Sequence, residues 1–443
     1  MFYLENIDWV DDYADQIQPY VFVREEDRLL IKIPNEAYKL NPQGIRILKH
    51  IFSGGTVRDI VNAYPDPEAV AEDIHYFFCD LKRLLKGCYH ERAEYRGIEK
   101  IGYDLGFQQL PVLSEIALTY RCNLKCRFCY AGCGYHPSDS GEMNFQEVCT
   151  ILNRIRNDAK VPSVSFTGGE PTLRNDLIDV IRHAKSLGMW TNLITNGTRI
   201  DPDLALSLKK AGLDSAQVSL EAGSRDLHDD IVRHHGAFHD SVRGLRALMD
   251  TGIRVHTNTT ICALNKDYLP EILRLVKRIG LNKLSMNLLM PAGSSLDTLD
   301  HLLVRYSEIG EIVCDVQQMA EAMGLEFMWY SPTPICLFNP VIHGQGNKGC
   351  AACDGLLSIA PNGDVLPCSS YPESVGNLLD ERTSFMDLWH SERARYFREK
   401  RYVHQKCRQC EHLAVCQGGC PLYWQHVGYK EILEDHYVPI SGS

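Results

Sequence analysis

The chain has 443 residues, of which 44% are hydrophobic and 23% charged, with a formal net charge of -11. This length exceeds what one compact core usually organises, so two or three domains are expected. The acidic balance argues against a nucleic-acid partner. No apolar stretch is long enough to cross a membrane, and the acidic N-terminus lacks the pattern of a signal peptide. These features predict a cytoplasmic protein without a membrane partner.

The 17 cysteines are unusual for such a chain. The cytosol keeps thiols reduced, so disulfides are not expected and tight cysteine groups indicate metal binding. Five cysteines lie apart from these groups in apolar contexts and are expected to be buried core thiols. They are Cys79, Cys88, Cys149, Cys262 and Cys314.

Residues 20–95 contain two strand-like segments, 20–25 and 29–34, followed by three helical patterns. The helical patterns cover residues 41–52, 56–64 and 67–87, with glycine and proline at the joins. Two strands followed by three helices predict a small winged-helix-like α+β domain.

Residues 113–330 alternate strand-like and helix-like segments with short connections. Several of the helical patterns end at glycine, a common helix stop. Six strand–helix units in a row predict an α/β fold with parallel strands, and the active site is expected at their C-terminal ends. The candidate strands are 114–120, 163–169, 190–197, 215–222, 254–261 and 283–291.

Residues 334–443 are rich in cysteine, glycine and proline and show little apolar periodicity. One helix is predicted over residues 384–400. Bound metal is expected to replace part of the missing hydrophobic core of this region.

Cys122, Cys126 and Cys129 lie within eight residues after the first strand of the second region. Three thiolates can bind three irons of a four-iron cubane and leave the fourth iron open to a further ligand. A zinc site and a redox-active Cys-x-x-Cys pair are the alternatives for this spacing.

The spacing Cys-x3-Cys-x-aromatic-Cys, with Phe128 in the aromatic position, resembles the signature of the radical S-adenosylmethionine (SAM) superfamily. The sequence Gly168-Gly169-Glu170 ends the second strand and resembles the family motif that cradles the amino group of SAM. The resemblance implies a partial (β/α)6 TIM-like barrel. It also implies seven residues at the SAM site, namely Phe128, Gly168, Gly169, Glu170, Asn196, Ser219 and Arg233.

By this resemblance, the amino and carboxylate groups of SAM chelate the open iron of a 4Fe-4S cluster. One electron then splits SAM into methionine and a 5′-deoxyadenosyl radical, which abstracts hydrogen from an unreactive carbon. An electron donor such as flavodoxin or ferredoxin is therefore an implied partner. No side chain is assigned as catalytic, and packing or solvation is the expected role of Glu221, Tyr330, His343 and Asp354.

The C-terminal cysteines follow the spacings Cys-x9-Gly-x4-Cys and Cys-x2-Cys-x5-Cys-x3-Cys, which resemble a SPASM domain, the auxiliary-cluster module of the same superfamily. The resemblance implies that Cys350, Cys353, Cys368 and Cys420 bind auxiliary cluster I, and that Cys407, Cys410 and Cys416 bind auxiliary cluster II. The last cysteine of the family pattern has no counterpart after Cys420. An open iron or a ligand from Asp435, His436 or Cys336 remains as an alternative.

The N-terminal region has eleven Lys and Arg against twelve Asp and Glu between Tyr20 and Tyr95, so it lacks a basic surface for DNA. Its Pro34…Leu40-Asn41…Gly44 and Gly55-Thr56-Val57 segments resemble the PqqD-like module called a RiPP recognition element. Such modules add a leader peptide to a sheet edge. That edge is expected at the strand Leu29–Ile33, or in the groove beside the third helix. A structural cap without a ligand is the alternative.

These features predict three domains: a PqqD-like domain over 1–100, a radical SAM barrel over 101–333 and a SPASM domain over 334–443. The predicted function is a maturase that modifies, and crosslinks, a ribosomally made precursor peptide bound through the N-terminal domain. The alternatives are a maturase for a tetrapyrrole side chain or an enzyme active-site residue, and a non-catalytic electron-transfer or iron-sensing module.

Overall fold

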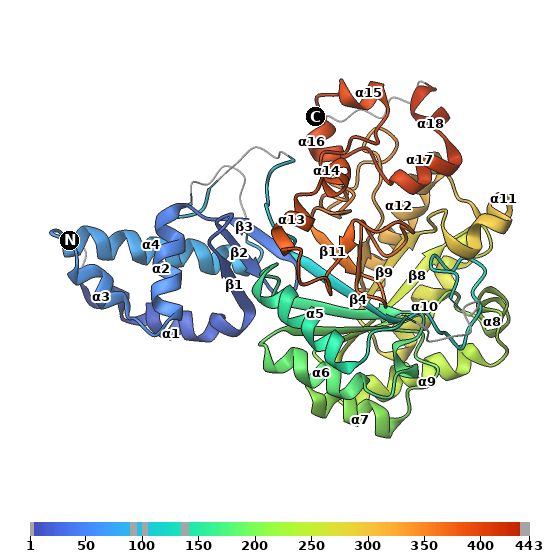
Figure 1. Ribbon diagram of the computed structural model, residues 1–443, viewed down its shortest axis with the longest axis horizontal. Helices are drawn as coiled ribbons and strands as arrows, with labels where there is room; N and C mark the ends of the chain where they lie inside the picture. The colour runs from blue at the N-terminus through green and yellow to red at the C-terminus, as the bar shows by residue number, and fades with distance from the viewer. Residues whose placement is uncertain (1–3, 89–94, 100–104, 134–140, 435–443) are drawn as a thin grey trace. The chain divides into compact units, whose positions relative to one another are not determined.

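The computed structural model describes residues 4–88, 95–99, 105–133 and 141–434. The chain separates into two compact units, Met1–Val112 and Leu113–Ser443 (Figure 1). The expected domain boundary between residues 100 and 101 falls outside the described residues. Within the described part of the chain, no helix is both long and apolar enough to cross a membrane.

The N-terminal unit combines a three-stranded antiparallel sheet with four α-helices around one apolar core. Side chains cap the helices that follow the sheet, which explains why these helices begin where they do. Asn41 caps the first, Thr56 and Asp59 form a capping box at the second, and Asp66 caps the third. The elements are α1 (Asp8–Ile17), β1 (Val21–Arg24), β2 (Leu29–Lys32), β3 (Glu36–Lys39), α2 (Pro42–Phe52), α3 (Val57–Asn62) and α4 (Pro67–Leu85), with the short η1 (Leu4–Ile7) and η2 (Gln18–Tyr20).

The sheet order β1-β2-β3 corrects one expectation. The strand at Leu29–Ile33 was expected to offer an open edge, but β2 is the central strand and pairs on both sides. The additional strand β3 follows β2 through a turn and occupies the second side. The outer strands of this sheet are therefore β1 and β3.

The second unit is built on a ten-stranded, mostly parallel sheet in the order β10-β9-β8-β7-β6-β5-β4-β11-β12-β13. All pairs are parallel except β11 with β12 and β12 with β13. The six predicted strands are present as β4 (Leu113–Thr119), β5 (Ser163–Gly168), β6 (Trp190–Thr195), β7 (Ser215–Ser219), β8 (Arg254–Ile261) and β9 (Lys283–Leu288). The α/β fold with a partial TIM-like barrel is thereby confirmed.

Helices cover the outer side of this curved sheet, where α6, α7 and α9 lie in succession (Figure 1). Parallel strands need such crossover helices to return the chain to the same end of the sheet. The helices are α5 (Phe145–Asn157), α6 (Leu177–Ser186), α7 (Pro202–Ala211), α8 (Arg225–Val232), α9 (Ala237–Asp250), α10 (Leu269–Ile279), α11 (Leu299–Leu302) and α12 (Tyr306–Ala322), with η3 (Pro171–Leu173), η4 (Lys266–Tyr268) and η5 (Gly293–Thr298).

The C-terminal segment extends the same sheet. β10 (Glu326–Trp329) adds to β9, and β11 (Leu356–Ile359) adds to β4. The single helix predicted over residues 384–400 is two helices, because Ser391 adopts an extended conformation and caps the second. The remaining elements are β12 (Asp364–Leu366), β13 (Gly376–Asn377), α13 (Phe385–Trp389), α14 (Glu392–Arg398), α15 (Gln405–Arg408), α16 (Leu413–Cys416), α17 (Pro421–Val427) and α18 (Lys430–Leu433).

The five isolated cysteines are not all core thiols. Cys149 and Cys262 are buried as expected, whereas Cys79 and Cys314 are half-buried. Cys88 is exposed, so its prediction was wrong. It follows Gly87 just beyond the end of α4, where the chain has already left the core.

Candidate functional site: a cysteine-lined cavity at the barrel mouth

A cavity of about 290 Å³ lies at the C-terminal ends of the barrel strands. It is lined by loop residues that follow β4, β5 and β6 and by side chains from β7, β8 and β9. The cavity brings together eight of the residues predicted for the SAM and cluster site. These are Cys122, Cys126, Phe128, Cys129, Gly168, Gly169, Asn196 and Ser219.

Hydrogen-bond donors surround the sulfurs of the first cysteine group. The backbone N–H of Leu124 donates to Cys122 Sγ at 3.4 Å, and that of Cys133 donates to Cys129 Sγ at 3.2 Å. Asn196 Nδ2 lies 3.9 Å from Cys122 Sγ. Donors placed on cluster sulfurs are a main means by which proteins set the potential of an iron–sulfur cluster.

The thiols differ in how readily they ionise. Burial raises the pKa of Cys122 to about 12 and that of Cys126 well above its usual value. The Cys133 thiol donates to Cys129 and, with nearby backbone N–H groups, lowers the pKa of Cys129 to about 7. Metal binding must therefore displace protons from Cys122 and Cys126, which couples loading of the site to proton release.

The cluster and the zinc alternative make different demands on the three thiols of the first cysteine group. A zinc site needs four ligands at about 2.0–2.3 Å from one point. The thiolates of a cubane bind different irons and stay further apart.

Two glycines let the ends of β4 and β5 approach closely. A Cβ on Gly168, whose φ is +128°, would lie 2.2 Å from Thr119 O, and a Cβ on Gly169 would lie 2.2 Å from Arg121 O. The backbone N–H of Gly169 donates to Thr119 O at 2.7 Å. Any side chain here would push the start of the cysteine loop away from the cavity.

Glu170 and Arg233 are not among the residues that line the cavity. Glu170 is fully buried behind it, where its carboxylate accepts from Thr195 Oγ1 and from the backbone N–H of Asn196, both at 2.8 Å. The Glu170 side chain thus fixes the turn that carries Asn196. Arg233 is an exposed residue at the end of α8 with a φ of +54°.

His228 supplies an unpaired donor at the cavity wall. Its Nδ1 accepts from the backbone N–H of Glu221 at 3.1 Å, and burial lowers its pKa to about 4. The ring is therefore neutral and carries its proton on Nε2, which has no hydrogen-bond partner among the described residues. A buried donor of this kind fits an acceptor on a bound ligand, such as the SAM carboxylate. The thiols, the glycine pair and this imidazole together fit a cluster with SAM.

Several lining residues were not predicted from the sequence. Cys133 stands four residues beyond the signature, and Tyr130 separates two cavities. A polar row crosses the barrel interior, where Asn258 Nδ2 donates to Asn287 Oδ1 at 2.7 Å. The sequence signal for this row is the polar residue at every second position of β8, at His256, Asn258 and Thr260. This alternation is typical of a strand whose inner face is polar.

Two carboxyl groups, the half-buried Glu115 on β4 and the buried Glu221 after β7, also line the cavity. Removal from water raises the pKa of Glu115 and raises that of Glu221 to about 8. Glu221 is therefore held toward the neutral form near neutral pH. Tyr330, His343 and Asp354 do not line this cavity.

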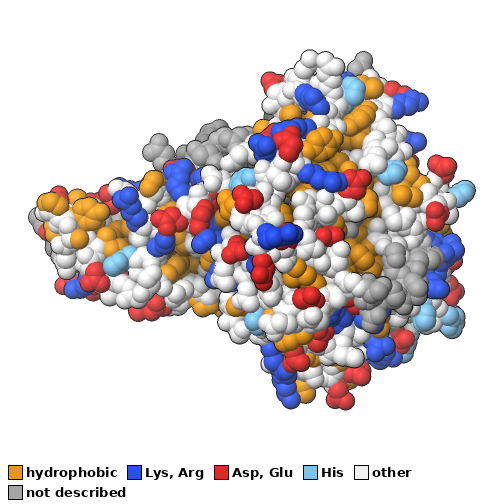
Figure 2. All heavy atoms as spheres, in the orientation of Figure 1, with side chains coloured by type: hydrophobic (Ala, Val, Ile, Leu, Met, Phe, Trp, Pro, Cys, Tyr) orange, Lys and Arg blue, Asp and Glu red, His pale blue; other side chains and the backbone are white. Residues whose placement is uncertain are grey.

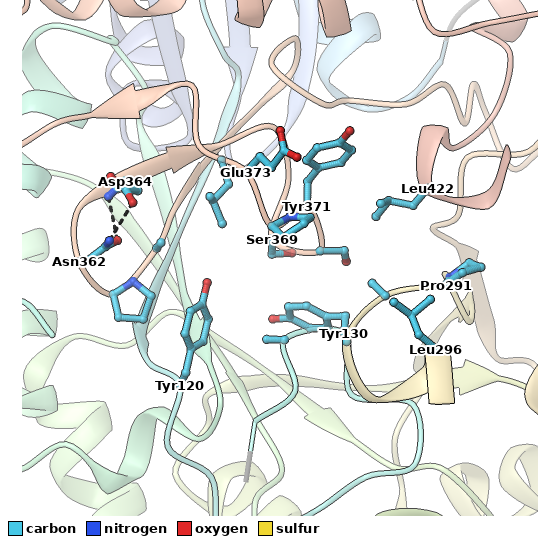
Figure 3. Close-up of a pocket in the computed structure, with 18 of the residues that line it drawn as sticks. Tyr120, Tyr130, Pro291, Leu296, Asn362, Asp364, Ser369, Tyr371, Glu373 and Leu422 are labelled. Carbon is cyan, nitrogen blue, oxygen red and sulfur yellow. Dashed lines mark hydrogen bonds between the residues drawn. The ribbon is translucent and has the colours of Figure 1, made fainter. Parts of the chain in front are cut away.

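A second cavity, of about 700 Å³, adjoins the first, and both are lined by Tyr130, Ser369 and Ser370. In Figure 3, Tyr120 and Tyr130 face Ser369, Tyr371 and Glu373 across an open space that Pro291, Leu296 and Leu422 close on one side. The described lining contains three carboxylates, Glu142, Asp364 and Glu373, and no Lys or Arg.

The four cysteines expected at auxiliary cluster I lie in one buried region. Burial raises the pKa of Cys368 well above its usual value, and the nearby thiols of Cys420 and Cys350 raise it further. Burial and the thiol of Cys350 likewise raise the pKa of Cys353. Basic residues surround them: Lys400 Nζ donates to the carbonyl of Cys350, and Arg398 Nε donates to that of Cys353 at 3.0 Å. Lys400 itself is buried, with Asp354 Oδ2 at 3.2 Å.

Cys407, Cys410 and Cys416 form the other expected group, on α15, α16 and the turn between them. The backbone N–H of Cys410 donates to Cys407 O at 3.1 Å. Asp435 and His436, two of the expected alternatives for the missing ligand, lie outside the described residues.

Comparison with known proteins agrees with this geometry. The family model of the radical SAM superfamily matches residues 116–288, and that of the SPASM iron–sulfur cluster-binding domain matches residues 350–411. The chain therefore contains a radical SAM domain followed by a SPASM domain, and it is a radical SAM enzyme. Its cofactors are SAM and iron–sulfur clusters.

Two curated relatives illustrate the range of its family. The AdoMet-dependent heme synthase of Oleidesulfovibrio alaskensis is 29% identical over 328 residues, covering 68% of this chain and 80% of the relative. The mycofactocin maturase MftC of Mycolicibacterium smegmatis is 28% identical over 326 residues, covering 70% of this chain and 78% of the relative. Streptococcus suis SuiB, solved bound to precursor peptide SuiA, shares the fold with a TM-score of 0.65 and 18% identity, covering 93% of this chain and 96% of SuiB.

Proposed function

We propose that this enzyme modifies a ribosomally made precursor peptide, forming a crosslink within it. The leader of the peptide binds the N-terminal unit, and a core residue enters the cavity of about 700 Å³. We assign residues 101–333 to the catalytic barrel and 334–443 to the auxiliary-cluster domain. A flavodoxin or ferredoxin supplies the electrons.

The observation that carries this proposal is the adjacency of the two cavities. Tyr130, Ser369 and Ser370 line both, so a peptide held in the larger cavity lies next to the cavity of the first cysteine group. Tyrosines 120, 130 and 371 give the larger cavity the mixed aromatic and polar lining that suits a peptide side chain.

When bound, the cluster and SAM supply a radical that takes one hydrogen from the substrate. The residues of this chain position the reacting groups and exclude water. Asn196 and the two glycines form part of the wall of the cofactor cavity, and His228 Nε2 offers a hydrogen-bond donor to a bound cofactor. After this hydrogen atom is lost, crosslink formation would release one proton and one electron. An auxiliary cluster would accept the electron, and the carboxylate of Glu115, on the wall of the cofactor cavity with Ser369 and Ser370, would accept the proton.

The N-terminal unit supports a peptide substrate through its sheet. β1 and β3 are its outer strands, but the end of β3 already pairs with residues 97–99, where the backbone N–H of Glu99 donates to Lys39 O at 2.9 Å. The leader peptide therefore adds to β1, by main-chain hydrogen bonds. On the face seen in Figure 2, Lys and Arg alternate with Asp and Glu over this unit, which argues for a peptide rather than nucleic acid as its partner. The likeness to SuiB covers 93% of the chain.

Oxidation of a tetrapyrrole is the second candidate, because a curated relative is named a heme synthase. Heme carries carboxylate side chains, which Arg or Lys would be expected to bind. The larger cavity offers three carboxylates and no Lys or Arg among its described lining. This electrostatic mismatch favours the peptide.

The test is coexpression with the short peptide encoded beside the gene, followed by mass spectrometry. We expect the peptide to lose two hydrogens, and no change with the variant Cys122→Ala/Cys126→Ala/Cys129→Ala. A porphyrin bearing propionate groups is the competing substrate. A shift of its Soret band on binding, together with an unchanged peptide, would support the tetrapyrrole reading instead.

A further inference from the structure

The segment between β10 and β11 brings one more cysteine to the group formed by Cys407, Cys410 and Cys416. The backbone N–H of Ile335 donates to Cys416 Sγ at 3.3 Å. Cys336 is the next residue along the chain. This contact, between positions 81 residues apart, therefore places the backbone next to Cys336 beside Cys416.

The turn that carries Cys336 is held from both sides. The backbone N–H groups of Leu337 and Phe338 both donate to Pro334 O at 3.0 Å. Ile335 and Phe338 are buried, at 5% and 4% exposure, while Cys336 between them is exposed. The residues on either side of the cysteine thus anchor the backbone and leave its side chain outside the core.

The same turn is fixed against the C-terminal cysteine region. A Cβ on Gly419 would lie 3.0 Å from Pro334 Cγ, so the two segments are in close contact. Although Cys336 is exposed, neighbouring atoms partly desolvate its thiol, and this desolvation, followed by the charges of Cys416, Cys407 and Cys410, raises its pKa to about 12. All three thiols are therefore within electrostatic range of Cys336.

We propose that Cys336 is the fourth thiolate of auxiliary cluster II, together with Cys407, Cys410 and Cys416. Four cysteine thiolates are the usual complement of a 4Fe-4S cluster. Cys336 would then take the place of the downstream cysteine of the family pattern, which has no counterpart in residues 421–443. Auxiliary cluster II then has no iron open to substrate, and its role is limited to electron transfer.

The first test uses the unmodified protein, in which the exposed thiol of Cys88 serves as the control. Cys88 and Cys336 are both exposed, but Cys88 belongs to no cysteine group. In the anaerobically reconstituted protein, iodoacetamide is expected to alkylate Cys88 and spare Cys336. After iron is removed with a chelator, Cys336 is expected to gain labelling, more slowly than Cys88 because its pKa is raised. Equal labelling of the two cysteines in the fully loaded protein would overturn the proposal. Labelling of Cys336 that does not change on iron removal would also overturn the proposal.

The second test measures iron in variants. Cys336→Ala is expected to lose between about one and about four irons per chain, as the reference variant Cys410→Ala does. Cys314→Ala, which removes a half-buried thiol outside the group, should lose none. Full iron in Cys336→Ala, with loss in Asp435→Ala or His436→Ala, would assign the ligand elsewhere. Both tests are read without substrate, so they are independent of the proposed peptide activity.

Discussion

At the scale of single residues, the cofactor cavity depends on groups kept neutral by burial. Glu221 is buried, and its carboxylate accepts from the backbone N–H of Thr260 at 2.8 Å. His228, which accepts from the N–H of the same Glu221, is neutral for the same reason. Uncharged walls weaken competition from water and strengthen hydrogen bonds to a ligand.

The variant Glu221→Gln should change how stability depends on pH. The pKa of Glu221 is raised from 4.5 to about 8 in the folded protein. Between these values the folded state binds more protons than the unfolded state, so the free energy of unfolding falls as pH rises. The slope from one such group is at most about 1.4 kcal/mol per pH unit. Urea unfolding of the metal-free protein from pH 5 to 8 should therefore show a shallower fall for the variant, and parallel curves would contradict this.

The variant His228→Phe should weaken SAM binding. It removes the Nε2 donor while keeping a ring of similar shape beside Phe238. A hydrogen bond to a charged acceptor contributes about 1.5–3 kcal/mol, so the Kd should rise at least about tenfold. The control is His256→Phe, a half-buried histidine of lowered pKa that does not itself line the cavity but contacts Gln217, which does. Equal Kd values for the two variants by calorimetry would exclude a contact from His228.

At the scale of elements, the sequence predicts the strands and helices that are long enough to show a repeating apolar pattern. The strands β4 to β9 have at least five residues each, and Gly212 and Gly280 end their helices in a left-handed conformation. β12 and β13 have three residues or fewer, too short for an alternating pattern. The single predicted helix at 384–400 failed because Ser391 can stand inside a helix or cap one, and the local pattern does not distinguish these.

The contact between the ends of β4 and β5 can be tested with two glycines of positive φ. Gly168→Ala would place a Cβ 2.2 Å from Thr119 O, whereas Gly188→Ala meets nothing within 4 Å. The φ angles are +128° and +71°, so both variants are strained, and Gly168→Ala the more so. Only Gly168→Ala should also displace the cysteine loop. We expect it to reduce the iron bound at the first site, measured after the auxiliary cysteines have been replaced. Matching iron contents in the two variants would contradict the close approach.

At the scale of the whole molecule, contacts between residues far apart in the sequence determine the features that could not be predicted from the sequence. The cysteine spacings predict three groups, but Cys336 and Cys416 are brought together only by the fold. Likewise, the pairing of β11 with β4 joins the C-terminal segment to the first barrel strand, which no local pattern indicates. A local sequence pattern indicates which residues are neighbours within one helix or strand, whereas these contacts depend on how distant segments of the chain are brought together by the fold.

The division into two units gives a direct test of leader binding. Residues 1–112 form a compact unit with its own apolar core, so this fragment should fold alone. Added in excess to the full-length enzyme, the fragment should bind the leader and suppress peptide modification, while SAM cleavage without peptide continues unchanged. The matched control is the same fragment with Leu30→Asp, because Leu30 is fully buried and a charge there should unfold it. If both fragments leave peptide modification unaffected at concentrations above that of the peptide, the leader does not bind this unit, and the substrate must be recognised by residues 113–443 alone.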